Sequence, residues 1–306
     1  MSWSTLTAAS KARVLGLLLS CVLVIMSLTV LSVKGLNFGL DFTGGYITEI
    51  NTASVTTITD LKAKLSPEVA SKLTISKAGE YHFVLREAPE VSKASTWQAE
   101  LNEQGVDYTV LSSSFLGSQV GDELFEQGCL ALFAALIAIM VYLAVRFEWR
   151  LAVGSVVALL HDLILVLGLF SLLGLEFNLT VLASLLAIIG YSLNDSIIVG
   201  DRVRELLRIQ PDNQRINTHV VINDAIGSTL TRTLITSGTT LATIACIWLL
   251  AGAALTGFAI ALFVGIVVGT FSSICIAATL PQLLGLSSEN YTQTLDDKTK
   301  AYMELP

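Results

Sequence analysis

The chain has 306 residues, of which 53% are hydrophobic and only 14% are charged, and its mean hydropathy is +0.70. A soluble domain has about 25% charged residues, so this composition argues against a soluble globular protein and against a disordered one. The net charge of −7 gives no support for nucleic-acid binding. The four cysteines lie in apolar stretches without C-x-x-C spacing, which argues against a disulfide framework or a thiolate metal site.

Apolar runs long enough to cross a bilayer core as a helix, about 20 residues, recur along the chain. The first is 14–33, and we interpret it as a retained span because it is too long for a signal-peptide core and no small-residue cleavage site follows. A polar segment, 34–127, comes next, and 128–288 then holds five spans. These five are predicted at 129–145, 151–175, 177–200 and twice within 233–288, with a turn at Ala251–Ala254.

The orientation follows from Lys and Arg in the short loops, since these residues concentrate on the cytoplasmic side. They occur before the first span, at Lys11 and Arg13, between the second and third spans, and in a polar connector at about 201–231. The alternate loops have none. The N-terminal segment 1–13 and the tail 289–306 are therefore predicted to be cytoplasmic, and 34–127 to be periplasmic.

Segment 34–127 has seven Lys or Arg and thirteen Asp or Glu, and it reads as a small α+β domain. Alternation and spacing predict the order strand, helix, strand, strand, helix, strand, which is typical of a ferredoxin-like module. The strands are predicted at 46–51, 72–76, 80–86 and 106–111, and the helices at 56–65, capped by Thr56, and at 93–104. The predicted fold class is a polytopic α-helical membrane protein with six transmembrane helices and this domain between the first two.

Ionisable residues inside a membrane are costly and by default indicate function. Asp195 lies about five residues inside its span, with Asn194 beside it and Tyr191 and Ser192 one turn back. Burial disfavours the charged form of a carboxyl group, so Asp195 is a candidate for reversible proton or ion binding. The alternative is a neutral, hydrogen-bonded structural acid.

Three other polar residues fall within predicted spans. Arg232 opens the fifth span, where Thr236 one turn on belongs to a hydroxyl-rich face typical of a wet seam, although Arg232 could instead snorkel to the cytoplasm. His161 and Asp162 lie near the middle of the third span and either continue a proton path or hold helices together. No zinc spacing, nucleotide loop or nucleophile elbow occurs, so we expect no enzyme activity, metal or cofactor beyond H⁺ or Na⁺ as coupling ion.

Small residues recur at intervals of four in the last span, which lets another helix approach closely. The neighbouring helix belongs either to this chain or to another subunit. The members of this ladder are Gly257, Ala261, Gly265, Gly269 and Ser273.

The motifs resemble one known family. The segment 39–45, Gly-Leu-Asp-Phe-Thr-Gly-Gly, is similar to the signature shared by the SecD/SecF family. Segments 147–150, 189–199 with Asp201-Arg202, and 231–240, together with His161-Asp162, resemble its SecF branch, although Gly200 stands where many relatives have Ser. The matching signature residues are Gly39, Asp41, Phe42, Gly44 and Gly45.

The resemblance covers about residues 35–285 and implies membership of the resistance–nodulation–division superfamily. It implies a six-span subunit in the lipid of the bacterial inner membrane that pairs with SecD and supports export of unfolded secretory polypeptides through SecYEG. It also implies that Asp195 and Arg232 are tied to ion flow. The alternative hypothesis is half of a small-molecule exporter of the same superfamily. Such exporters typically have twelve spans and two large outer domains in one chain, so the six spans here favour a half-transporter that works with a partner.

Overall fold

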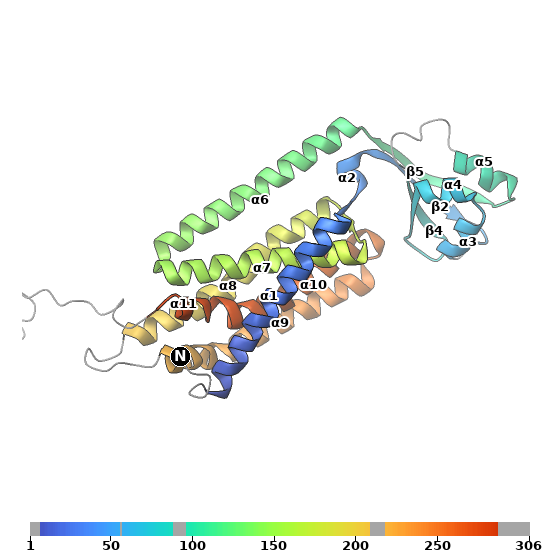
Figure 1. Ribbon diagram of the computed structural model, residues 1–306. Helices are drawn as coiled ribbons and strands as arrows, with labels where there is room; N and C mark the ends of the chain where they lie inside the picture. The colour runs from blue at the N-terminus through green and yellow to red at the C-terminus, as the bar shows by residue number, and fades with distance from the viewer. Residues whose placement is uncertain (1–6, 56, 88–95, 209–217, 287–306) are drawn as a thin grey trace, which may run out of the picture.

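The computed structural model describes residues 7–55, 57–87, 96–208 and 218–286. Within them, six helical segments are long and apolar enough to cross a membrane, which confirms the predicted membrane fold (Figure 1). The predicted cytoplasmic tail lies outside the described residues. The six segments are α1 (Ala8–Lys34), α6 (Ser118–Arg146), α7 (Trp149–Leu173), α8 (Leu179–Arg208), α9 (Thr218–Leu250), and α10 (Ala253–Ser272) with its continuation to Leu283.

Three of these helices form the centre of the bundle. In their most apolar windows, 50% to 56% of the residues of α7, α8 and α10 with its continuation are buried, against 11% to 17% for α1, α6 and α9. The small-residue ladder explains the close contact of α10 with α8. A Cβ added to Gly265 would lie 2.4 Å from Cδ1 of Ile188, and one on Gly269 would lie 3.2 Å from Cβ of Ser192. The ladder therefore packs inside this chain.

The last span is not a regular helix throughout. After Ser272 it continues as a π-helical segment, η3 (Ser273–Ala277), and then as the short helix α11 (Leu280–Leu283). This end of the span is packed against two other helices. Nη1 of the buried Arg13 in α1 lies 3.4 Å from Oγ1 of Thr279, and a Cβ on Gly154 of α7 would lie 2.8 Å from the carbonyl oxygen of Ala277.

Several helices are longer than the apolar runs predict. The second span begins as a helix at Ser118, ten residues before the expected boundary at 128. The expected polar connector at about 201–231 is largely helical. Its first part, to Arg208, belongs to α8, its last part, from Thr218, belongs to α9, and 209–217 lie outside the described residues. An apolar run marks the part of a helix that suits lipid, whereas amphipathic turns continue beyond it, as the buried Ile222 of α9 illustrates. The turn predicted near Ala251 is present at Gly252, whose φ is +78°.

The α+β domain has a four-stranded antiparallel sheet in the order β3-β4-β2-β5. This strand order and the observed element order confirm the ferredoxin-like prediction. Its core is made by one face of the sheet and the helices, and includes Phe83, Leu61 and Leu101, each fully buried. The elements are β2 (Gly45–Thr52), α3 (Ile58–Ala63), α4 (Pro67–Lys72), β3 (Leu73–Lys77), β4 (His82–Glu87), α5 (Thr96–Glu103) and β5 (Tyr108–Leu116).

The predicted elements of this domain need three corrections. The cap of α3 is Thr57, whose Oγ1 accepts from the Asp60 amide at 3.1 Å, whereas Thr56 lies outside the described residues. Helix α4 was not predicted, although Ser66 as cap and Pro67 at the first helical position are its start signals. Strand β5 runs to Leu116, opposite Gly45, because pairing with β2 continues toward the membrane domain.

Candidate functional site

Asp195 of α8 is a buried acid that has no hydrogen-bond partner in the described part of the chain. Its exposed fraction is 1%, and neither carboxylate oxygen has a hydrogen-bond partner among the described residues. Two nearby polar groups on α8 and α9, the hydroxyls of Ser196 and Thr233, are also buried and unpartnered there. A buried carboxylate is costly unless it is paired, protonated or bound to a cation. The local chemistry therefore suits reversible binding of a proton or a small cation.

Arg232 of α9 lies close enough to act on Asp195 electrostatically, but the two side chains do not form an ion pair within the described part of the chain. Arg232 is exposed on the outer face of its helix. The hydroxyl of Thr236 donates to the carbonyl oxygens of Arg232 and Thr233, at 3.0 and 3.1 Å, so it is engaged by its own helix. An arginine on a helix face at membrane depth needs water or a polar partner, which makes this face a suitable contact for another chain.

Asp162 lies at the centre of a separate polar cluster that joins α7, α8 and α10. Its side chain is fully buried, and its Oδ2 accepts from the hydroxyls of Ser192, at 2.5 Å, and Ser272, at 2.9 Å. Its Oδ1 lies 2.9 Å from Nδ1 of His161, although neighbouring positions on a helix point about 100° apart. Nε2 of His161 is buried without a partner among the described residues. The cluster connects the three central helices through hydrogen bonds.

Two further candidate residues of α8, Tyr191 and Asn194, lie outside the Asp162 cluster. The hydroxyl of Tyr191 donates to Ser237 at 3.3 Å, and Ser237 in turn is 2.8 Å from Thr270, so this second contact joins α8, α9 and α10. Asn194 is exposed and belongs to neither cluster. The sequence analysis missed Ser272, Ser237 and Thr270 as partners. These three residues could have been noticed as hydroxyl-bearing residues in apolar spans. Their spacing in the sequence does not show which acid or hydroxyl each of them contacts.

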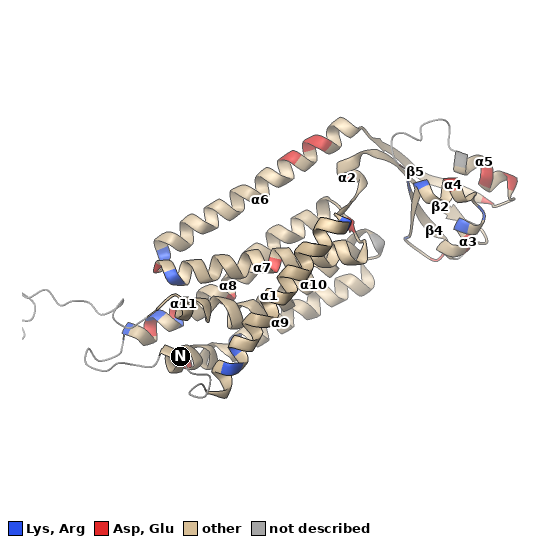
Figure 2. Ribbon diagram, in the orientation of Figure 1, with Lys and Arg blue, Asp and Glu red and all other residues tan. Residues whose placement is uncertain are grey.

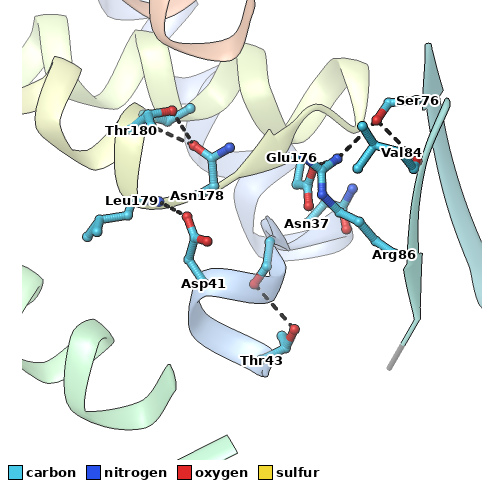
Figure 3. Close-up of polar contacts among 12 residues, drawn as sticks. Asn37, Asp41, Thr43, Ser76, Val84, Arg86, Glu176, Asn178, Leu179 and Thr180 are labelled. Carbon is cyan, nitrogen blue, oxygen red and sulfur yellow. Dashed lines mark hydrogen bonds and ion pairs between the residues drawn. The ribbon is translucent and has the colours of Figure 1, made fainter. Parts of the chain in front are cut away.

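The signature residues all lie in one junction, where α1, the α+β domain and the α7–α8 connection meet. Strand β1 (Asn37–Phe38) pairs in parallel with β6 (Glu176–Phe177), directly before α8. One carboxylate oxygen of Asp41, in α2 (Leu40–Thr43), accepts from the Leu179 amide at 2.9 Å (Figure 3). The signature therefore ties the start of the α+β domain to the start of α8.

Two further contacts strengthen this junction. The ring of the buried Phe42 stacks on Phe177, with centroids 5.8 Å apart. Arg86 of β4 reaches across from the sheet, and its Nη1 lies 3.2 Å from Oε2 of Glu176 and 3.3 Å from Oγ of Ser76 (Figure 3). The sheet is thus docked on the α7–α8 connection as well as joined to it through the chain.

Gly44 and Gly45 are required by conformation and by space. Their φ angles are +70° and +139°, which side chains rarely adopt. A Cβ on Gly44 would lie 2.8 Å from the backbone of Ser118 at the start of α6, and one on Gly45 would lie 2.2 Å from the carbonyl oxygen of Glu87. The two glycines therefore form a close-packed crossing of three chain segments, not a flexible link.

Gly45→Ala is expected to lower the free energy of unfolding by about 3 kcal/mol or more, because backbone strain and a backbone clash combine. Gly174→Ala is the matched control, since Gly174 also has a positive φ, +64°, but a Cβ there would meet nothing within 4 Å. That control should lose only about 1 kcal/mol. Thermal unfolding in mild detergent measures both, and equal losses would show that the close approach at Gly45 is unimportant.

Comparison with known proteins identifies the family. Residues 96–287 match the family model described as protein export membrane protein SecD/SecF, C-terminal, and residues 29–52 match the SecD/SecF GG motif. The chain is 39% identical to the protein translocase subunit SecF of Desulfurispirillum indicum, over 88% of this chain and 89% of that protein. It is 38% identical to the SecF subunit of Escherichia coli O157:H7, over 92% and 89%.

The fold agrees with a solved structure of the same family. The crystal structure of SecDF from Thermus thermophilus, described as a translocon-associated membrane protein, superimposes with a TM-score of 0.79 at 32% identity. The match covers 93% of this chain and 39% of that one, so this chain corresponds to part of the SecDF polypeptide. These relatives are translocase components, which does not favour the exporter alternative. The chain is a multi-pass membrane protein that belongs to the SecF proteins of the SecD/SecF family.

Proposed function

We propose that this chain is an auxiliary subunit of the Sec protein translocase in the bacterial inner membrane. Together with SecD it uses the ion gradient to promote export of unfolded secretory polypeptides through SecYEG. The observation that carries this proposal is Asp195, a buried carboxyl group in a membrane helix that has no hydrogen-bond partner within residues 7–55, 57–87, 96–208 and 218–286. Such a group is too costly to serve packing alone, whereas it suits a site that is occupied and emptied in turn.

In the proposed cycle, a proton or Na⁺ reaches Asp195 and changes its interaction with Arg232. Neutralisation of the carboxylate weakens the attraction between α8 and α9, and this local charge change shifts the balance between two arrangements of the helices. One charge crossing 100 mV supplies about 2.3 kcal/mol. Export of one polypeptide therefore needs many ions, each driving a small movement of the α+β domain.

The partner of the exposed face of α9 is, in this proposal, SecD. Arg232 is exposed there, and among the described residues no neighbour lies within 4 Å of a Cβ added to Gly190 of α8 or to Gly238 of α9. Exposed small residues and a cation on neighbouring helices suit close contact with another membrane helix that carries polar groups. The match to part of the longer SecDF chain supports the same pairing.

The orientation in this proposal puts the α+β domain in the periplasm and the chain ends in the cytoplasm. Figure 2 shows Lys and Arg at the α6–α7 turn, at the C-terminal end of α8 and at the N-terminal end of α1, all at the end of the bundle away from the α+β domain. Positive residues favour the cytoplasmic side, so the α+β domain faces outward.

A cysteine in place of Lys77 should react with a membrane-impermeant thiol reagent added outside spheroplasts, whereas one in place of Arg208 should react only after the membrane is permeabilised. The four native cysteines, which are free, are first replaced by Ala or Ser. Residue 77 ends β3 of the α+β domain and residue 208 ends α8. Labelling at 208 and not at 77 in intact spheroplasts would reverse the orientation.

The function itself is tested by depleting the protein in cells and following maturation of secretory precursors. Precursors should accumulate, and collapse of the coupling gradient should reproduce this defect in cells that retain the protein. Collapsing the H⁺ and Na⁺ gradients separately identifies the ion. Accumulation of a drug with normal precursor maturation would instead support a small-molecule exporter and contradict the proposal.

A further inference from the structure

The first turn of α8 is held by two side chains from different parts of the chain. Oδ1 of Asn178 accepts from the amide of Val181 at 3.0 Å, and its carbonyl oxygen accepts from the amide of Leu182 at 3.0 Å, which makes Asn178 the N-cap and Leu179 the first helical residue. The amide of Leu179 donates at 2.9 Å to Asp41, which lies 138 residues earlier. One cap is therefore local, and the other comes from the signature segment.

The Asp41 contact is favourable for two physical reasons. A hydrogen bond to a carboxylate is roughly twice as strong as one between neutral groups. The negative charge also lies at the positive end of the helix dipole. Among the described side chains of α2, that of Asp41 is the one that bonds to α8 itself.

Asp41 is connected through the chain to the sheet of the α+β domain. Residues 44 and 45 follow α2, and Gly45 begins β2, the strand that pairs with both β4 and β5. At this crossing, Gly44 packs closely against Ser118 of α6 and Gly45 against Glu87 of β4. A displacement of α2 is therefore passed to the sheet and to the start of α6 as a rigid movement.

The hydrogen bond between Asp41 and Leu179 is also connected, through α8, to Asp195. The helix runs without interruption from Leu179 to Arg208, and Asp195 is 16 residues from its start, which corresponds to about 24 Å. On the way, Ser192 is bound to Asp162 of α7. A helix transmits an axial shift along its length because its own hydrogen bonds keep its rise fixed.

We infer that Asp41 is a positioning residue that couples α8 to the α+β domain. When an ion moves α8 at Asp195, the bond between Asp41 and the first amide of α8 carries that shift into α2, across the Gly44–Gly45 crossing and into β2. This inference rests on the proposed function, because it requires that ion binding at Asp195 moves α8. It assigns to the signature acid a mechanical task separate from ion binding.

The test separates ion flow from export. In membrane vesicles that contain the whole translocase, Asp41→Ala should reduce ion-driven export of a secretory precursor about tenfold, the factor expected from loss of one charge-assisted hydrogen bond. Ion flux through the protein should stay within about twofold of the wild type, because the surroundings of Asp195 are unchanged. Asp41→Asn should be intermediate, since its side-chain oxygen can still accept from the Leu179 amide.

A second variant removes the same bond from the opposite side. Leu179→Pro deletes the donating amide, and proline is well accepted at the first position of a helix. It should uncouple flux from export as Asp41→Ala does, and the double variant should be no worse than either single one. Asn178→Ala is the matched control, because it removes the local cap of the same turn and leaves the Asp41 bond in place, so coupling should persist.

The outcomes distinguish this inference from the proposed function. Gradient-independent export by the wild type would contradict the proposed function. Gradient-driven export by the wild type with equal export by Asp41→Ala and Leu179→Pro would overturn only the role of Asp41. A parallel loss of flux and export in both variants, or uncoupling by Asn178→Ala as well, would also overturn it, because the turn would then be needed only for structure.

Discussion

Asp195→Asn should abolish the ion-driven part of export while insertion and association with SecD remain intact. Asparagine has nearly the same shape as aspartate, so the packing of α8 is kept, but it neither takes up a proton nor balances a cation. Export by inverted membrane vesicles should fall to the level seen when the gradient is collapsed. Arg232→Lys should retain part of the activity, since the charge survives and the planar guanidinium does not.

Glu205→Gln is the matched control for Asp195→Asn. Glu205 is an acid on the same helix, but it is exposed and paired with Arg202 at 2.7 Å, so its replacement should leave gradient-driven export unchanged. Full gradient-driven export by Asp195→Asn would remove Asp195 from the mechanism. An equal loss in Asp195→Asn and Glu205→Gln would indicate a general effect of charge on α8.

Asp162→Ala should destabilise the membrane domain by about 3–5 kcal/mol. It leaves the hydroxyl of Ser192 and Nδ1 of His161 without their buried partner, and each such group costs roughly 1–3 kcal/mol, whereas Ser272 still donates to the carbonyl oxygen of Gly269 at 3.1 Å. Asp162→Asn should lose less, because one side-chain oxygen still accepts a hydroxyl. Unfolding in mild detergent, followed by circular dichroism against denaturant, measures the loss.

This second experiment decides between the two roles that the sequence leaves open for His161 and Asp162. A large loss of stability with the remaining folded protein still active supports the role of joining helices. Unchanged stability together with lost gradient-driven export would instead place Asp162 on the ion path. Ser155→Ala in α7 is a suitable control, since the buried Ser155 hydroxyl donates to the Leu151 carbonyl oxygen of its own helix at 3.1 Å and the replacement removes no charge.

The fold could be predicted from the sequence wherever a local pattern determines the structure. Apolar length gives the six spans, and the alternation of residues in the α+β domain gives its strands and, with their order, the ferredoxin-like module. Boundaries were less accurate, because α6, α8 and α9 continue beyond the lipid-suited runs on amphipathic turns packed against neighbours. Helix α4 has no fully buried residue, so its sequence lacks the apolar periodicity that indicates the equally short α3.

The sequence indicates which residues belong to the candidate sites, but it does not indicate which residues they contact. An acid or arginine in an apolar run is conspicuous, and Asp195, Asp162 and Arg232 stand out for that reason. The distance between side chains on different helices depends on helix rotation and crossing, which no local pattern specifies. The serines around Asp162 and the bond between Asp41 and α8 join residues 30 to 138 positions apart, so only the structure reveals them.

The π-helical segment η3 makes the last span sensitive to the insertion or deletion of a single residue. A π turn holds one residue more than an α turn, so the chain beyond it is rotated by about 100° relative to a continuous α-helix. The helix is anchored before this turn by Ser272, which bonds to Asp162, and after it by Thr279, which contacts Arg13. Deleting any one residue of 273–277 would allow a continuous α-helix with regular backbone hydrogen bonds. It would nevertheless rotate the helix beyond the deletion and turn Thr279 away from Arg13 of α1. Homologous chains should therefore tolerate substitutions in this segment far better than single-residue gaps.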